Sequence, residues 1–365
     1  MLTRCANTRT QSCETCLLSE SRWIDARIGL IAEQYALGDE PWLLGFSGGK
    51  DSSAVLKLVY EAVRRTSNAK RLVNVVYCDT GVEIPVVREH VRRTFRRLRL
   101  EAKADGIPLR ITIAQPNIQD RYFVKVIGRG YPPPTNKFRW CTDRLRINPI
   151  RRVLKAQHAK SATVIVGTRG GESAERDRVL ARYRNENAQF YFRQHGAPNI
   201  RLFAPIVDFG TRDVWSILLS VTKPTAVDGN QVLSIYKDAG AECPVVRDTH
   251  GTPCGNGRFG CWTCTVVRQD KAVTNLVAQG YSEMEPLLEF RNWLAAFRDQ
   301  PSARCRVRRN GVMGSGPLTL RARRETLERL RYAERRSGQQ LISKAEITMI
   351  RLLWKRDRNS ASYRE

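Results

Sequence analysis

The stretch WLLGFSGGKDSSAVLKLVYEAV, residues 42–63, places a short apolar run, a glycine-rich turn and an amphipathic segment directly after one another. The apolar run at residues 42–46 has the length of a buried strand, and apolar residues recur at helical spacing over residues 55–63. Ser-Gly-Gly at residues 47–49 marks the turn between them. The stretch therefore predicts a strand that passes through a glycine turn into a helix.

The same alternation continues beyond this stretch. Residues 72–78, 109–113 and 163–167 predict further strands, and residues 86–102 predict a second long helix. Residues 116–141 contain glycines and three consecutive prolines and predict a loop. Alternating strands and helices of these lengths predict an α/β fold with a doubly wound, mostly parallel sheet.

Composition excludes several classes of protein. The 365 residues carry a formal net charge of +26, and the sequence pI is near 10.2. With 42% hydrophobic and 27% charged residues, the chain is typical of a globular protein. No apolar run approaches the roughly 20 residues of a membrane span, and the opening MLTRCANTRT lacks the apolar core of a secretory signal. We therefore expect a cytoplasmic protein with no membrane partner and with a polyanion as its first partner.

The turn SGGKDSS, residues 47–53, has the composition of an anion-binding loop. Glycines let the backbone wrap closely round an anion, and the N-terminus of the following helix offers N–H groups and a favourable dipole. The turn is not a Walker A loop, because Leu44 stands where the first glycine should be and Asp51 stands at the Ser/Thr position. An ordinary glycine-rich turn between a strand and a helix is the alternative interpretation.

Two further segments, CDTGVEIP at residues 78–85 and GTRGGESAERDR at residues 167–178, follow predicted strands. Ligands of open α/β sheets bind at that carboxyl edge. The candidate nucleotide-binding residues of the two segments are Asp79, Gly81, Gly167, Arg169 and Arg176. Each segment alone is equally compatible with a charged loop, whereas together with the glycine turn they favour a nucleotide site.

Ten cysteines in a chain with no export signal indicate metal binding or catalysis more than disulfides. Cys261 and Cys264 form a C-x-x-C pair, a spacing that lets two thiolates ligate one metal or cluster. The predicted ligands are Cys141, Cys243, Cys261 and Cys264, with Cys254 as a fifth candidate. Spacing does not separate Zn²⁺ from an iron–sulfur cluster, and buried unreactive thiols are the alternative. We interpret Cys78 and Cys305 as structural.

The turn at residues 47–53 resembles the PP-loop of N-type ATP pyrophosphatases, which cleave ATP to AMP and pyrophosphate. The resemblance implies a PP-loop fold of the adenine nucleotide α-hydrolase type, and the two later segments resemble those of the phosphoadenosine phosphosulfate (PAPS) reductase superfamily. It implies catalytic roles for Lys50, Asp51 and Ser52, with Asp51 also holding Mg²⁺. The residues that it implies for cradling pyrophosphate are Ser47, Gly48, Gly49, Ser52 and Ser53.

Residues 41–63, 127–147 and 241–271 are similar to DndC-like proteins of bacterial DNA phosphorothioation, and the resemblance runs from about residue 24 to residue 293. It implies an ATP pyrophosphatase and sulfurtransferase that uses ATP, Mg²⁺ and a [4Fe–4S] cluster to replace a non-bridging oxygen of the DNA backbone by sulfur. It also implies three kinds of partner: DNA, a cysteine desulfurase that donates sulfur, and other proteins of the Dnd system or the related Ssp system. The segment CDTGVEIP is closer to the reductase form of its motif. The sequence therefore does not decide whether the protein serves a Dnd, an Ssp or another antiphage defence system.

The resemblance also divides the chain. Residues 1–40 are expected to form an N-terminal helical segment, and residues 41–220 a PP-loop ATP pyrophosphatase domain. Residues 221–290 are expected to form a cysteine-rich iron–sulfur segment, and residues 291–365 a basic helical C-terminal region.

Basic residues cluster in two places. In VREHVRRTFRRLRL, residues 87–100, helical spacing puts the apolar residues on one side and leaves the arginines exposed. Residues 301–365 carry a net charge of +11. The basic residues singled out there are Arg321, Arg323, Arg324, Arg335, Arg336, Lys355 and Arg356. Such charge gives affinity for nucleic acid without reading sequence, whereas solvated helix faces or an acidic partner protein are alternatives.

Three rival functions share parts of this pattern. A sulfonucleotide reductase of the PAPS or APS type needs a redox cysteine near its C-terminus, and the sequence has none beyond Cys305. A tRNA thiolation enzyme also combines SGGKDS with cluster cysteines. A DNA-binding scaffold that keeps ATP as a structural ligand is the non-enzymatic alternative, which the intact Lys50, Asp51 and Ser52 disfavour.

Overall fold

The computed structural model describes residues 14–156, 161–171, 178, 181–182, 184–185, 188–193, 199–241 and 259–358. These residues form a seven-stranded sheet in the order β3-β2-β1-β4-β7-β6-β5. The strands are β1 (Trp42–Phe46), β2 (Val73–Cys78), β3 (Leu109–Ala114), β4 (Ala162–Ile165), β5 (Arg184–Asn185), β6 (Ala188–Arg193) and β7 (Ile200–Phe203). The first five strands in the spatial order are parallel, and β6 and β5 add an antiparallel edge.

The central strand β1 is apolar because both of its faces are covered. Trp42, Leu44 and Phe46 point into the main core, and Leu43 belongs to a small second core on the opposite face. Trp42 pairs with Val73 of β2 on one side and with Thr163 of β4 on the other. A parallel strand buried on both faces is expected to read as a continuous apolar run, as this one does.

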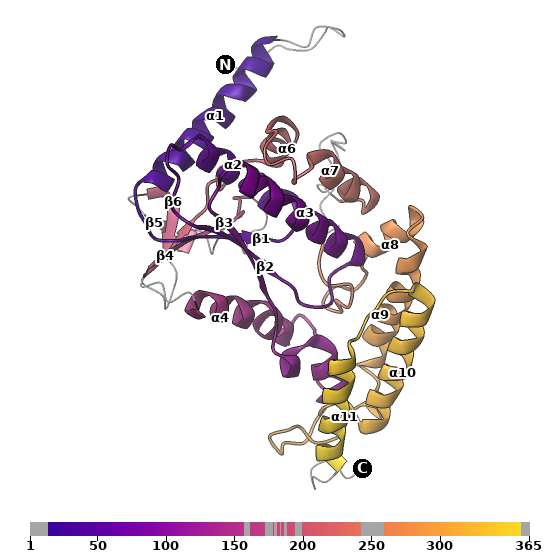
Figure 1. Ribbon diagram of the computed structural model, residues 1–365. Coiled ribbons are helices and arrows are strands. Elements are labelled where there is room, and N and C mark those ends of the chain that lie inside the picture. Colours follow the sequence, from indigo (N-terminus) through magenta and orange to yellow (C-terminus); the bar gives the residue numbers. More distant parts are fainter. Residues whose placement is uncertain are drawn as a thin grey trace.

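Helices cover both faces of the sheet. Figure 1 shows α1 (Glu14–Ala36), α2 (Lys50–Arg65) and α3 (Pro85–Ala104) on one face and α4 (Asn148–Ala156) on the other. The chain leaves β1 toward β2 and β3 and then returns to β4 on the other side of β1, so the strand order reverses between β1 and β4. The doubly wound, mostly parallel α/β fold is confirmed, and the reversal marks the crevice where such sheets bind ligands.

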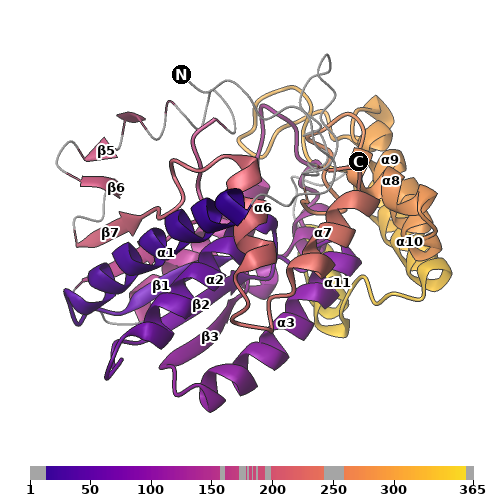
Figure 2. The ribbon, with the colours of Figure 1, turned by 90° about the horizontal axis from the view of Figure 1, so that it is seen from above.

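The remaining helices extend the fold away from the antiparallel edge. α6 (Thr211–Ser220) packs on α2, and α7 (Gly229–Asp238) follows it. The C-terminal part contains α8 (Lys271–Ala278), α9 (Glu285–Phe297), α10 (Leu320–Ser337) and α11 (Lys344–Arg358), with short 3₁₀ turns at Ser282–Met284 and Pro301–Ala303. Figure 2 shows these helices at the end of the molecule opposite β5, β6 and β7. In the described part of the chain, no helix is long and apolar enough to cross a membrane.

Two boundary predictions were wrong. β4 ends at Ile165, two residues before the expected end. The expected loop at residues 116–141 contains a 3₁₀ turn at Ile118–Asp120 and a π-helical turn at Val124–Gly128, and a second π-helical turn at Thr142–Ile147 follows it. Val124–Gly128 is fully buried and packs against α10 and α11. The apolar run there is too short to show a helical period between its proline and glycine neighbours.

Candidate functional site

The glycine turn lies at the carboxyl end of β1, next to the point where the strand order reverses. The Ser47 N–H donates to Ser52 Oγ at 3.1 Å, and the Ser52 hydroxyl donates to the Gly49 carbonyl at 3.0 Å. Ser47 Oγ lies 3.0 Å from Ser52 Oγ. These contacts tie the two ends of the turn together, and Ser52 takes part in all three of them.

Two of the predicted glycines are required by close packing. Gly48 has a φ of +78°, and a Cβ built there would lie 2.5 Å from Cγ2 of Val91 on α3. Gly167, which follows β4, would place a Cβ 3.0 Å from the carbonyl carbon of Asp51. The turn after β1 is therefore packed directly between α3 and the segment after β4.

The start of α2 has the features of a phosphate site. Gly49 is its N-cap residue, and it has no side chain that could accept from the first N–H groups of the helix. Ser53 is completely buried, and its hydroxyl has no hydrogen-bond partner among the described residues. The first N–H groups of a helix lack partners within the helix, and its dipole favours an anion at this end. The geometry at the start of α2 fits a phosphate group of ATP.

A carboxylate and two cations meet beside the turn. Asp51 Oδ1 accepts a hydrogen bond from Arg169 Nε at 2.5 Å, and Asp51 Oδ2 lies 3.1 Å from Lys50 Nζ. Arg169 and Lys50 are buried, with 4% and 6% of their surfaces exposed, and Arg169 also donates to Thr211 Oγ1 at 3.3 Å. The structure thus joins three predicted site residues from the segments after β1 and β4.

Tyr236 of α7 is a site residue that the sequence did not reveal. Its hydroxyl accepts the Lys50 N–H at 3.1 Å, and its ring centre lies 5.5 Å from Lys50 Nζ. Its hydroxyl would be 3.1 Å from a Cβ on Gly49. Tyr236 is separated from Lys50 by 186 residues and belongs to no motif, so no local signal connects it to the glycine turn.

The CDTGVEIP segment forms a turn tied by its own acidic side chains. Glu83 Oε1 accepts from the Thr80 N–H at 2.7 Å and from its hydroxyl at 2.5 Å, and Glu83 Oε2 accepts from the Gly81 N–H at 3.1 Å. Gly81 has a φ of +80°, and its N–H also donates to Asp79 Oδ1 at 3.0 Å. Burial raises the pKa of Glu83, and the nearby Asp79 adds to the rise. The predicted residues Asp79 and Gly81 shape this turn in the structure.

The same turn reaches the cysteine-rich segment. Glu83 forms an isolated antiparallel β-bridge with Cys261, and the Trp262 N–H donates to the Val82 carbonyl at 3.0 Å. Thr80 Oγ1 lies 3.7 Å from Cys261 Sγ. The segment after β2 therefore packs directly against the C-x-x-C pair.

Cys264 neighbours two other predicted cysteine ligands, Cys261 and Cys141. The Cys264 N–H donates to the Cys261 carbonyl at 2.9 Å, which closes the C-x-x-C turn. Burial raises the pKa of Cys261 to about 11, with Arg146 acting against the rise. Burial also raises the pKa of Cys141, and the charge of Cys264 adds to the rise. All three are free thiols, and so are Cys78 and Cys305. The Cys78 thiol contacts the Leu145 carbonyl at 3.1 Å, as a structural cysteine would.

The described cysteine and aspartate side chains have donor atoms that suit metals, but the described residues form no complete metal site. Among the described residues, no group of three or more His, Cys, Asp or Glu side chains is placed to hold a metal ion. Cys243, Cys254 and Arg176 lie outside the described residues. Thiolates suit an iron–sulfur cluster or Zn²⁺, and the carboxylate of Asp51 suits Mg²⁺, although both of its oxygens already contact cations.

The basic surfaces are placed largely as predicted. On α3 the apolar side chains Val87, Val91, Phe95 and Leu98 are buried. The exposed arginines of this helix are Arg92, Arg93, Arg96, Arg97 and Arg99. In the C-terminal cluster the exposed members are Arg321, Arg324, Arg335, Arg336, Lys355 and Arg356.

The exposure predicted for Arg323 was wrong. Its side chain is completely buried, donates to the Gly128 carbonyl at 2.7 Å and pairs with Asp357 at 2.7 Å. Arg323 therefore joins α10 to α11 and to the π-helical turn at Val124–Gly128, and it does not face solvent.

Sequence comparison gives one family and one curated relative. The model of the phosphoadenosine phosphosulfate reductase domain matches residues 41–266, more than half of the chain. An uncharacterized protein of Methanocaldococcus jannaschii is 26% identical over 197 residues, which are 54% of this chain and 35% of that protein. The chain thus spans about a third of the length of that relative.

Structural comparison finds distant likenesses. PAPS reductase from Candida auris in a phosphate complex has a TM-score of 0.36 at 12% identity and covers 63% of this chain and 94% of its own. FMN adenylyltransferase from Candida glabrata, in complex with FAD and pyrophosphate, has a TM-score of 0.39 at 15% identity. The match covers 68% of this chain and 73% of the adenylyltransferase. The U34-tRNA thiolase NcsA from Methanococcus maripaludis, with its [4Fe–4S] cluster, has a TM-score of 0.37 at 11% identity. The match covers 77% of this chain and 79% of the thiolase.

Proposed function

Because the chain belongs to the phosphoadenosine phosphosulfate reductase domain family, we propose that it is a PP-loop ATP pyrophosphatase that transfers sulfur to the DNA backbone. One observation carries the proposal: residues 78–85 contact the C-x-x-C pair and also join β2, the sheet neighbour of β1, to α3, which packs against the glycine turn. Thr80 and Glu83 of that segment contact Cys261. An enzyme that activates with ATP and then delivers sulfur needs a phosphate site and a thiol site this near to each other.

The first reaction is activation of a phosphodiester. A non-bridging oxygen of DNA attacks the α-phosphorus of ATP, forming a new O–P bond and breaking the bond to pyrophosphate. The first-turn N–H groups of α2, Lys50 and Arg169 stabilise the negative charge that moves onto pyrophosphate. Mg²⁺ would neutralise part of that charge, and it would compete with Lys50 and Arg169 for the carboxylate of Asp51.

The second reaction exchanges oxygen for sulfur. A sulfide-level nucleophile (HS⁻) attacks the activated phosphorus of DNA and forms the P–S bond, while the bond from that phosphorus to the bridging oxygen breaks and the oxygen leaves with AMP. Sulfur that arrives as a persulfide is first reduced to this level by two electrons from a cellular thiol, which becomes a disulfide. The residues proposed to hold a [4Fe–4S] cluster are Cys141, Cys243, Cys261 and Cys264, with Cys254 as the fifth candidate. Such a cluster would supply a soft site for sulfur beside the DNA. A cysteine desulfurase is the proposed sulfur donor, and other Dnd or Ssp proteins are the proposed partners.

Product analysis tests the activation step. Purified protein is incubated with radiolabelled ATP and Mg²⁺, alone, with duplex DNA or with tRNA, and Asp51→Ala serves as the inactive control. The proposal expects cleavage between the α and β phosphates, with pyrophosphate release stimulated by DNA and lost in the variant. AMP stays on the DNA phosphate until water or a sulfur nucleophile attacks it, so sulfide is added in a second arm to release AMP. ADP and phosphate as products would contradict it. Stimulation by tRNA without stimulation by DNA would favour the tRNA thiolation function instead.

A further inference from the structure

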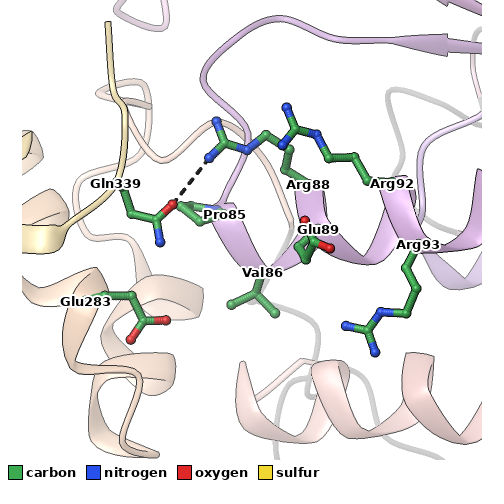
Figure 3. A pocket seen from close by; sticks show the side chains of 8 residues that line it. All are labelled: Pro85, Val86, Arg88, Glu89, Arg92, Arg93, Glu283 and Gln339. Carbon is green, nitrogen blue, oxygen red and sulfur yellow. Dashed lines mark hydrogen bonds between the residues drawn. The ribbon is translucent and has the colours of Figure 1, made fainter.

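A polar pocket of about 390 Å³ lies on the far side of α3 from the glycine turn. Figure 3 shows its charged lining: Arg88, Arg92, Arg93 and Glu89 come from α3, and Glu283 and Gln339 come from the C-terminal part. Glu283 lies in the 3₁₀ turn Ser282–Met284, and Gln339 lies between α10 and α11. The pocket is therefore a groove between the sheet domain and the C-terminal helices.

The cations of this groove are available to a ligand. Arg88 donates to Gln339 Oε1 at 3.4 Å, and Glu89 is paired with Arg96 at 3.4 Å. Within the described residues, no ion pair involves Arg88, Arg92 or Arg93, although Glu283 faces the same space. Guanidinium groups present planar donor pairs that match the oxygens of a phosphate.

The positive charge extends along α3 beyond the groove. Arg96, Arg97 and Arg99 are exposed on the same helix. From Arg88 to Arg99 the helix rises about 16 Å at 1.5 Å per residue. One strand of a DNA duplex carries a phosphate about every 3.4 Å along the duplex axis, so about 16 Å of axis holds about five phosphates of one strand. Because the strand winds round the axis, only some of these can face the row of arginines. A row of that length fits a phosphodiester polymer better than a single phosphate ion.

The opposite face of α3 forms a wall of the nucleotide site. Val91 lies against Gly48 of the glycine turn, and His90 Cδ2 would lie 3.7 Å from a Cβ there. The groove and the turn are therefore separated by about one helix diameter, roughly 10 Å. A backbone held by the arginines would run beside the site where ATP is proposed to react.

We propose that this groove binds the phosphate backbone of DNA and anchors it next to the nucleotide site. The proposal rests on the proposed function in taking DNA as the substrate. Neutralising Arg92 and Arg93 removes two phosphate contacts, which lowers the slope of log affinity against log salt by about 1.8. The same slope change corresponds to a loss on the order of 60-fold in affinity at 0.1 M salt.

The test compares Arg92→Gln/Arg93→Gln with Arg321→Gln/Arg324→Gln, which makes the same charge change at exposed positions on α10. Arg324 precedes Gln339 by 15 residues, or roughly 20 Å along the helix. Fluorescence anisotropy of labelled duplex DNA, without ATP, is measured between 50 and 300 mM salt. We expect the large loss and the lower slope for the α3 variant alone. Equal losses in both variants, or none in the α3 variant, would overturn the proposal.

Two further arms identify the ligand and separate this proposal from the activation chemistry. Displacement of DNA by millimolar inorganic phosphate at constant ionic strength would assign the groove to free phosphate and overturn the proposal, as would tighter, arginine-dependent binding of tRNA. ATP cleavage is followed separately in the same variants without nucleic acid, where the α3 variant should retain its basal rate. Arginine-dependent DNA binding without DNA-stimulated release of pyrophosphate from ATP would support the groove and contradict the proposed function.

Discussion

Replacing Gly48 by Ala tests the packing that holds the glycine turn against α3. The φ of +78° costs an alanine about 1–2 kcal/mol, because its Cβ crowds the following carbonyl oxygen. The new Cβ would also lie 2.5 Å from Val91 Cγ2, closer than real carbon atoms approach. Val91 is 1% exposed and has no space to move into, so overpacking adds about 1–3 kcal/mol. We expect Gly48→Ala to lower the free energy of unfolding by about 2–5 kcal/mol.

Gly81→Ala is the matched control for this change. Gly81 has nearly the same φ, +80°, but nothing lies within 4 Å of a Cβ built there. It should cost only the backbone strain of about 1–2 kcal/mol. Urea unfolding of both variants, followed by circular dichroism, isolates the overpacking as the difference between them. Equal destabilisation would refute the direct contact between the glycine turn and α3, on which the placement of the arginine groove depends.

Three further predictions concern buried groups. Burial lowers the pKa of His90 from its ordinary value of 6.5, so as the pH falls below 6.5 the unfolded chain takes up a proton first and the free energy of unfolding declines until the folded pKa is reached. His90→Gln should flatten this part of a plot of Tm against pH. An unchanged slope in the variant would contradict the prediction. Arg323→Met should lower the free energy of unfolding by about 3–5 kcal/mol, because it breaks a buried ion pair. The control, Arg324→Met, changes an exposed neighbour and should alter that free energy by no more than about 0.5 kcal/mol. Similar urea midpoints for the two variants would show that Arg323 is exposed. Tyr236→Phe should lower the free energy of unfolding by about 1–3 kcal/mol, because the buried Lys50 N–H loses its acceptor. Hydrogen exchange at the Lys50 amide should become faster in this variant. An unchanged exchange rate would contradict the contact.

The sequence was sufficient for the strands β1 to β4 and for the glycine turn because those features are local, whereas β5, β6 and β7 were not predicted. An apolar run, two glycines and a helical period are adjacent at residues 42–63, and together they predict a strand, a turn and a helix. Gly167 and Arg169 were predicted for the same reason, since they directly follow a strand whose carboxyl end must lie at the ligand edge. The structure adds that Arg169 reaches Asp51, a contact across 118 residues that no local pattern encodes.

The parts that could not be predicted depend on tertiary packing. Tyr236 has no motif around it and reaches the glycine turn only because α7 packs there. Arg323 looked like one of several exposed arginines, yet the close approach of α11 buries it against Asp357. The buried turn at Val124–Gly128 was missed because its period is too short to recognise. Exposure of a charged residue is decided by the neighbouring helix, which a single sequence does not show.

Mass spectrometry of nuclease-digested DNA tests sulfur transfer to the DNA backbone most directly. DNA would be taken from cells that carry the wild-type gene in its own operon and from cells that carry Cys261→Ser. We predict phosphorothioate-linked dinucleotides in the first and none in the second. Their presence in the DNA of both kinds of cell would show that Cys261 is not needed for sulfur transfer. Their absence from the wild-type cells would contradict DNA phosphorothioation as the function of this protein.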